Sequence, residues 1–163
     1  MSVAPAVSAY EVVLAIHIMA VVLAFGVTFA YPIMFAVAAR QDPRSLPLMH
    51  RVEYTVERFM INPALVVVLG AGIYLASEAH VWSEFFVQWG LAAVVVIGAL
   101  VGAVMIPTAK RAESVVARDF AAVGEGTPQM SGEYRALVRR ATAVGTLLSA
   151  LVLVTILFMT IKP

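Results

Sequence analysis

The sequence predicts an all-α protein: a four-helix transmembrane bundle with up-down topology and both termini outside. Composition is the first reason, because 62% of the 163 residues are hydrophobic and only 13% are charged, whereas a soluble domain carries about a quarter charged residues. Four helix-length apolar runs are the second reason, and the distribution of basic residues between them is the third. The length suits a single integral membrane domain over residues 1–163.

The first predicted span covers residues 11–39. A helix needs about 20 apolar residues to cross roughly 30 Å of hydrocarbon, and this run has enough. No Lys or Arg precedes it, and it is longer than the core of a signal peptide, so we expect it to stay in the mature protein. Arg40 and the pair Asp42-Pro43 end the helix, because proline disfavours helical geometry in the residue before it.

A cytoplasmic loop is predicted for residues 40–58, and the second span for residues 59–77. Within the loop, Glu53 and Glu57 are four residues apart, which indicates an amphipathic helix that leads into the span along the membrane surface. Pro63 lies near the start of the span and is expected to kink it, because a proline in a membrane helix frees a backbone carbonyl.

The remaining two spans are predicted over residues 85–107 and 141–161. A short turn at residues 78–84 is enough to join the antiparallel second and third helices. Between the third and fourth spans, residues 108–140 form a second cytoplasmic loop, in which Ser131 is a candidate helix cap.

The basic residues favour one orientation of these spans. Of the 11 Lys and Arg residues, four lie in the first long loop, six in the second and one at the C-terminus. The positive-inside rule therefore places both long loops in the cytoplasm and both termini outside. We expect a multi-pass protein of the cell inner membrane, with the lipid bilayer as its main partner. The loop residues that set this orientation are Arg40, Arg44, Arg51, Arg58, Lys110, Arg111, Arg118, Arg135, Arg139 and Arg140.

His17 is the sharpest functional candidate, because it interrupts an otherwise apolar run. A helix advances 100° per residue, so Thr28 and Tyr31 share its sector. Polar groups are costly in hydrocarbon, and this sector is expected to face the bundle interior. One interpretation makes His17 the metal ligand of haem b, with Thr28 and Tyr31 beside the cofactor, or a proton relay. The other makes it a packed histidine that bonds a neighbour, and the sequence leaves both open.

Three further residues are candidates for binding a cofactor. His80 is the other histidine predicted on the outer side and would complete a bis-histidine site, although a turn residue also fits an ordinary solvated side chain. Arg58 and Asn62 lie along one side of the second helix and suit an acidic group, such as a haem propionate or a lipid phosphate. The alternative is an arginine that extends to the interface and sets the topology.

Several classes of function find no support. The chain contains neither a phosphate-binding glycine loop nor a nucleophile elbow, so no enzyme is expected. A formal net charge of +1 gives no indication of nucleic-acid binding, and the lack of cysteine excludes disulfides and thiolate metal sites. Spans two to four carry no charged residue, which is untypical of an ion-coupled transporter.

The segment HIMAVVLAFGVTFAYP, residues 17–32, resembles the first helix of a bacterial family of predicted integral membrane proteins, the domain-of-unknown-function family 2269. Chain length, four spans and the charged loop before Asn62-Pro63 are also similar to that family. More distantly, the segment is similar to copper-resistance D-type membrane proteins and to the J-type membrane protoporphyrinogen oxidase. In those relatives the first-helix histidine is taken to be a haem or metal ligand, and His17 alone carries over.

Three functional hypotheses follow. The first is a small haem-binding or redox-associated membrane protein with His17 as ligand. The second is a cofactor-free structural or assembly protein, in which His17 ties helices together. The third is a lipid-interacting or permease-like protein that uses the side of the second helix with Arg58 and Asn62. A second copy of the chain or a membrane complex remains open as a further partner.

Overall fold

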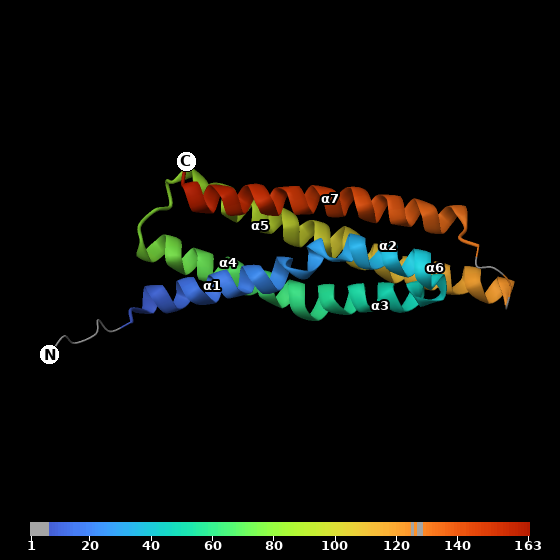
Figure 1. The fold of residues 1–163 in the computed structure, drawn as a ribbon. Helices are drawn as coiled ribbons and strands as arrows, with labels where there is room; N and C mark the ends of the chain where they lie inside the picture. Colours follow the sequence, from blue (N-terminus) through green and yellow to red (C-terminus); the bar gives the residue numbers. More distant parts are fainter. Residues whose placement is uncertain (1–6, 125, 127–128) are drawn as a thin grey trace.

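The computed structural model describes residues 7–124, 126 and 129–163. In this part of the chain, four long helical rods run side by side in up-down order (Figure 1), and no strand occurs. Each rod is long and apolar enough to cross a membrane. The predicted all-α class with four transmembrane helices is therefore confirmed. The rods comprise Ala9–Gln41, Pro43–Glu78, Phe85–Val123 and Gly132–Ile161.

Three of the four rods are interrupted, and α7 alone runs straight through among the described residues. A 3-10 turn at Val27–Phe29 breaks the first rod, and π-helical turns at Glu57–Ile61 and Val101–Met105 break the second and third. A further 3-10 turn, Pro43–Ser45, precedes α3. The resulting helices are α1 (Ala9–Phe25), α2 (Tyr31–Gln41), α3 (Leu46–Val56), α4 (Asn62–Glu78), α5 (Phe85–Leu100), α6 (Ile106–Val123) and α7 (Gly132–Ile161).

Local sequence signals explain where these helices begin. Ser8 caps α1 in a capping box, in which its hydroxyl accepts from the Glu11 N–H and the Glu11 carboxylate accepts from the Ser8 N–H. Ser131 caps α7 through the Tyr134 N–H. A proline stands in the first turn of α2, α3, α4 and α6, the position where a helix tolerates it best. In α4 and α6 this turn directly follows a π-helical turn, so the missing N–H coincides with the interruption of the rod.

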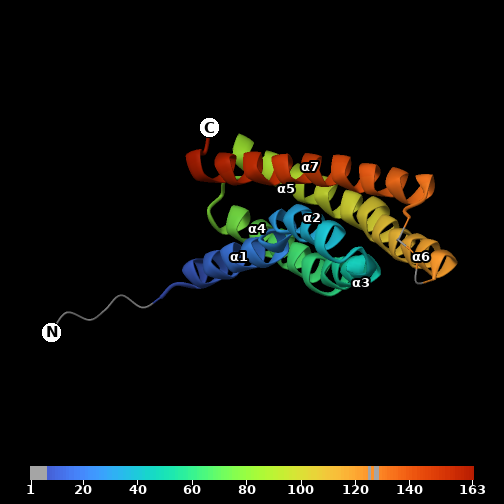
Figure 2. The same ribbon diagram turned by 45° about the vertical axis from the view of Figure 1, so that its right-hand side comes forward.

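The three interruptions lie at one level and divide the bundle into two halves. Val27, Ile61 and Val101, one from each interruption, join the same apolar cluster around Val152 of α7. We call α1, α4, α5 and the end of α7 the outer half, and α2, α3, α6 and the start of α7 the inner half. In Figures 1 and 2, the inner half is gathered at the end of the bundle opposite the C-terminus.

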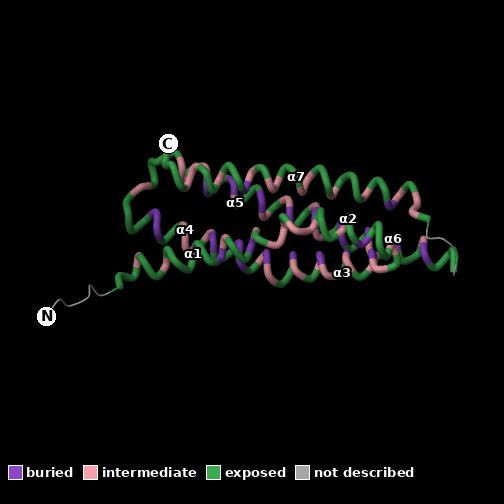
Figure 3. The backbone as a smooth tube through the Cα atoms, viewed as in Figure 1, coloured by how far each residue is buried: buried purple, intermediate pink, exposed green. Residues whose placement is uncertain are grey.

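The segments predicted as cytoplasmic loops are mostly helical. Residues 40–58 contain α3, and residues 108–140 contain most of α6 and the first turns of α7. The 30 residues of α7 extend about 45 Å at 1.5 Å per residue, which exceeds the roughly 30 Å of a hydrocarbon core. The inner half therefore continues the rods beyond the predicted spans, and its buried residues form an apolar cluster of their own. Figure 3 marks buried positions along α3 and α6 in purple.

Candidate functional site: an interior polar cluster

Three polar residues face inward from one side of the second rod. His50, Glu53 and Glu57 are spaced by three and four residues, so they share one face of a helix. Their relative exposures are 5%, 6% and 3%, which is unusual for charged residues. We call these three residues, together with Tyr31 and Tyr134, the interior polar cluster.

His50 stands at the centre of a short hydrogen-bonded chain. Its Nδ1 lies 3.0 Å from Oε2 of Glu53, and its Nε2 lies 3.0 Å from the hydroxyl of Tyr134. An ionised carboxylate only accepts, so Nδ1 carries the hydrogen that it shares with Glu53. Phe35 of α2 packs against the imidazole with a ring-centroid distance of 4.6 Å. Both nitrogens of this buried histidine are therefore paired, and its ring is held in place.

Glu57 is buried more deeply, and its carboxyl group is not fully paired. Its Oε2 has no hydrogen-bond partner in the described structure, and the same is true of the Tyr31 hydroxyl. Glu53 and Glu57 are close enough to interact electrostatically with each other and with this hydroxyl. Buried polar groups are normally satisfied, and an isolated buried carboxylate is very costly. Glu57 is therefore neutral through a bound proton, or it is balanced by a cation.

Three of the four rods supply residues to this site, and the third rod packs against the second. Glu57 is the first residue of a π-helical turn, a feature that is frequent at functional sites. Tyr31 is the first residue of α2, directly after the interruption of the first rod, and Tyr134 lies in the first turn of α7. On α6, which packs along α3, Thr108 is buried with 5% exposure.

The helix that the spacing of Glu53 and Glu57 predicts is present as α3 and the π-helical turn after it, and both carboxyl groups point into the bundle. The exposed side of the same helix carries Arg51 and Arg58 instead. Arginine reaches water easily with its long side chain, whereas the carboxylates are covered by α2, α6 and α7.

His17 lies in a different environment, in the close contact between α1 and α4. A Cβ atom added to Gly72 would stand 3.4 Å from Cε1 of the imidazole. Nδ1 is buried and has no hydrogen-bond partner of acceptable geometry among the described residues, although the backbone of Val68 is near. The ring therefore packs beside a glycine, and one of its nitrogens has no hydrogen-bond partner.

A haem group beside His17 would require a cavity of several hundred Å³. Two open hollows of about 480 and 430 Å³ lie on the surface of α2, around Ile33 and Val37. His17 lines neither. The unpaired nitrogen fits a metal ligand, but neither of these hollows offers space for a macrocycle beside it.

The structure does not bring the other sequence-predicted site residues to His17. His80 is exposed in the turn after α4, about two helical turns beyond Gly72, and its Nδ1 lies 3.0 Å from the Glu78 carbonyl. Thr28 donates to the Phe25 carbonyl in its own rod. The remaining three residues are distributed as follows: Tyr31 in the interior polar cluster, Arg58 exposed with its guanidinium 5.8 Å from the Phe59 ring centroid, and Asn62 half-buried at the start of α4.

No group of three or more His, Asp or Glu residues in the described ranges could hold a metal ion. The interior polar cluster contains one imidazole and two carboxyl groups, and its oxygens are partly used by internal hydrogen bonds.

Comparison with known proteins gives one positive result. The model of a family described as predicted integral membrane protein (DUF2269) matches residues 11–163. The chain belongs to this family. No curated protein and no solved structure matches it significantly. The matched region of this DUF2269 protein contains His17 and the whole interior polar cluster.

Proposed function

We propose that this DUF2269 protein binds and releases a small cation, in the simplest case a proton, at the interior polar cluster. The observation that carries the proposal is the Glu57 carboxyl group, which is 3% exposed and has an oxygen without a partner in the described structure. Ionisable residues enclosed in a membrane bundle are functional candidates by default, because keeping them there is expensive.

The neighbouring side chains supply a route for the proton. The groups that face Glu57 or its neighbours are Glu53 and His50 from α3, Tyr31 from α2 and Tyr134 from α7. An imidazole accepts a proton at one nitrogen and gives up another at the second. A proton taken up at Nε2 of His50 therefore leaves from Nδ1 to Glu53, and reaches Glu57 from there.

The direction of access follows from the charge distribution. Ten of the 11 basic residues lie in the segments that flank the inner half, and the positive-inside rule assigns these segments to the cytoplasm. We accordingly place the cluster at the cytoplasmic side of a cell inner membrane, with both termini outside. The protein then takes up its cation from the cytoplasm.

Infrared difference spectroscopy of the protein in nanodiscs tests this proposal. We expect a protonated-carboxyl band that appears on acidification and is absent in Glu57→Gln. Glu84→Gln is the matched control, because Glu84 is exposed in the turn before α5, and we expect it to keep the band. A second series at constant pH, with sodium, potassium or choline chloride, separates a metal cation from a proton. The proposal fails if no band depends on Glu57 in either series.

Haem binding through His17 is a second candidate. The unpaired Nδ1 of His17 and the similarity of the first helix to haem-binding or metal-binding relatives support it. Protein purified from haem-replete cells should show a Soret band that His17→Ala removes and His80→Ala retains. A colourless wild-type protein would eliminate this candidate without affecting the first.

A further inference from the structure

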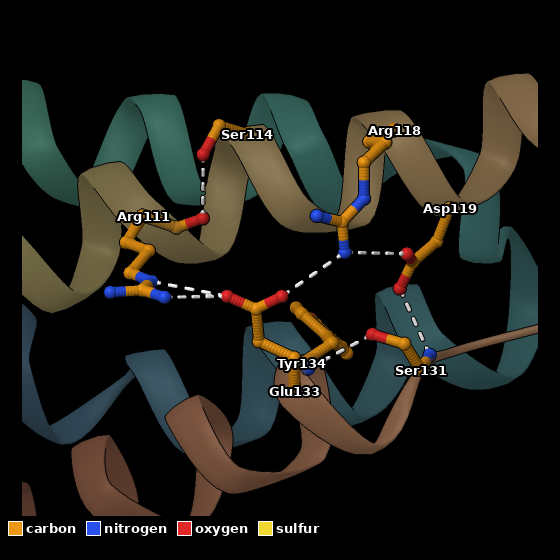
Figure 4. A network of polar contacts seen from close by, with 7 residues as sticks. All are labelled: Arg111, Ser114, Arg118, Asp119, Ser131, Glu133 and Tyr134. Atoms are coloured by element: carbon orange, nitrogen blue, oxygen red, sulfur yellow. Dashed lines mark hydrogen bonds and ion pairs between the residues drawn. The ribbon is translucent and has the colours of Figure 1, made fainter.

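We propose that the first turn of α7 is a gate between the cytoplasm and the interior polar cluster, held closed by an ion-pair clamp to α6. The role of this gate rests on the proposed function of the cluster, whereas the contacts that form the gate do not depend on it. The clamp consists of Arg111, Arg118 and Asp119 on α6 and of Ser131 and Glu133 at the start of α7 (Figure 4).

The clamp joins the two helices through both oxygens of one carboxylate. Arg111 donates to Oε1 of Glu133 from Nε at 3.2 Å and from Nη2 at 2.7 Å. Arg118 donates to Oε2 of Glu133 at 3.2 Å and to Oδ1 of Asp119 at 3.3 Å. The second oxygen of Asp119 accepts from the Ser131 N–H at 2.9 Å. A carboxylate near a helix N-terminus is also favoured by the helix dipole.

The same turn of α7 carries the outermost member of the buried chain. Tyr134 directly follows Glu133, and its N–H donates to the Ser131 hydroxyl at 3.2 Å. Its side chain points to the opposite side, is 3% exposed, and places its hydroxyl on His50. The clamp therefore fixes the position of Tyr134, and Tyr134 covers Nε2 of His50.

The clamp is built to open more easily than the core beneath it. The side chains of Arg111 and Arg118 are 66% and 60% exposed, and that of Glu133 is 37% exposed. Exposed ion pairs are individually weak and are screened by salt. The contact of Tyr134 with His50, in contrast, is sealed from water. Displacement of the first turn of α7 would break this contact and connect His50 to the cytoplasm, while Glu57 stays in place.

Chemical labelling of histidine tests the gate. Diethyl pyrocarbonate modifies accessible imidazoles, and mass spectrometry of the protein in nanodiscs reads His50 against His80, which is exposed. We expect Glu133→Gln to raise the labelling rate of His50 by about fivefold, the upper range for loss of an exposed ion pair. Asp119→Asn is a second variant for which we expect a smaller rise. High salt should raise the rate in the wild-type protein.

Glu113→Gln is the matched control. It breaks the Arg51–Glu113 ion pair between α3 and α6, with an N–O distance of 2.8 Å, and leaves α7 untouched. We expect His50 to be labelled at the wild-type rate in this variant. Equal rates in wild-type, Glu133→Gln and Asp119→Asn would overturn the gate, as would an equal rise in Glu113→Gln.

The labelling experiment is independent of cation binding. If the Glu57 infrared band is absent but Glu133→Gln still exposes His50, the proposed function fails and the gate stands. If both hold, a pH jump should produce the Glu57 band faster in Glu133→Gln than in Glu113→Gln. A purely structural role of Glu133 would change the stability of the protein but not this rate.

Discussion

The two histidines within the bundle have opposite environments. His17, in the outer half, is prominent in the sequence because its neighbours are apolar. In the described structure, however, its Nδ1 has no hydrogen-bond partner, and its ring packs beside Gly72. His50, in the inner half, lies in a charged segment that resembles a surface helix, yet both its nitrogens are hydrogen-bonded. A polar residue in an apolar run is easy to recognise in the sequence as a candidate site. Its chemistry, however, depends on the groups that contact it in the folded protein.

The two halves also bury different kinds of group. In the outer half, small residues such as Ala24 and Ala76 are buried beside larger ones such as Leu65. The small residues let the helix backbones approach closely, as is typical of helices in lipid. The inner half buries Leu46 and Phe120 in a core that extends beyond the spans, and it also buries charged residues. There the hydrophobic effect contributes to stability, and it must offset the cost of these buried polar groups.

The largest expected effect separates the two histidines. His50→Leu leaves Glu53 and Tyr134 unpaired in the interior, at about 1–3 kcal/mol each, so we expect a loss of about 2–6 kcal/mol. His17→Leu removes a nitrogen that already lacks a partner, and we expect a change within about 1 kcal/mol. Chemical unfolding in detergent micelles measures both.

Equal losses in the two variants would contradict this contrast. A large loss in His17→Leu would mean that Nδ1 has a strong partner in the folded protein, and the hypothesis that His17 ties helices together would gain support. A small loss in His50→Leu would mean that water enters and satisfies Glu53 and Tyr134.

The next effect separates two tyrosines of the interior polar cluster. Tyr134→Phe removes a hydroxyl that is bonded to His50, and we expect it to cost about 1–3 kcal/mol because a buried acceptor loses its partner. Tyr31→Phe removes a hydroxyl that has no partner among the described residues, so we expect no loss or a slight gain in stability. The same unfolding measurement compares them, and a loss in Tyr31→Phe would show that its hydroxyl is bonded in solution.

The fold could be predicted from the sequence because lipid imposes a simple code. Long apolar runs must be helices, and the arginine-rich segments between them determine which ends lie together. The spacing of Glu53 and Glu57 correctly indicated one helical face. The partner of this face was not predictable, because Tyr134, which contacts His50, is 84 residues further along the chain.

One signal did exist for the direction of that face. Arg51 and Arg58 enclose Glu53 and Glu57 in the sequence of the second rod. At 100° per residue, the two arginines share one side of the helix and the two glutamates share the opposite side. Acidic and basic side chains are equally stable in water at a cytoplasmic surface, but only the basic ones set the orientation of the spans. A carboxylate side opposite an arginine side is thus a reason to look for an interior partner. Tyr31 gives no such signal, because a tyrosine in an apolar run is also common at interfaces.

A third effect, of at most about 1 kcal/mol, concerns two glycines of the outer half. A methyl group at Gly72 would make an ordinary contact with His17, and alanine favours a helix over glycine by about 1 kcal/mol. We therefore expect Gly72→Ala to be neutral or stabilising. At Gly90 the new Cβ would lie 2.0 Å from Cε of Met159, so this flexible side chain must move. We therefore expect Gly90→Ala to stabilise the protein less than Gly72→Ala does. Equal free energies of unfolding in the two variants would show that the Met159 side chain moves without cost.

The smallest effect is a pH dependence of the clamp at the inner end. Hydrogen bonds from Arg111 and then Arg118 lower the pKa of Glu133, and those from Ser131 lower the pKa of Asp119. A carboxyl group with a lowered pKa in the folded state stabilises that state above its unfolded pKa, near 4. This contribution is lost as the pH falls through the lower folded value. Labelling of His50 should therefore be independent of Glu133 protonation at neutral pH.

Acidification should weaken the clamp only below about pH 4, where both carboxyl groups begin to take up protons. Diethyl pyrocarbonate reacts poorly with protonated imidazole, so the unfolding midpoint is the better measurement in this range. We expect the midpoint of the wild-type protein to approach that of Glu133→Gln as the pH falls, while Glu113→Gln keeps a separate offset. Curves for wild-type and Glu133→Gln that stay parallel to the lowest pH would mean that Glu133 contributes through packing rather than charge.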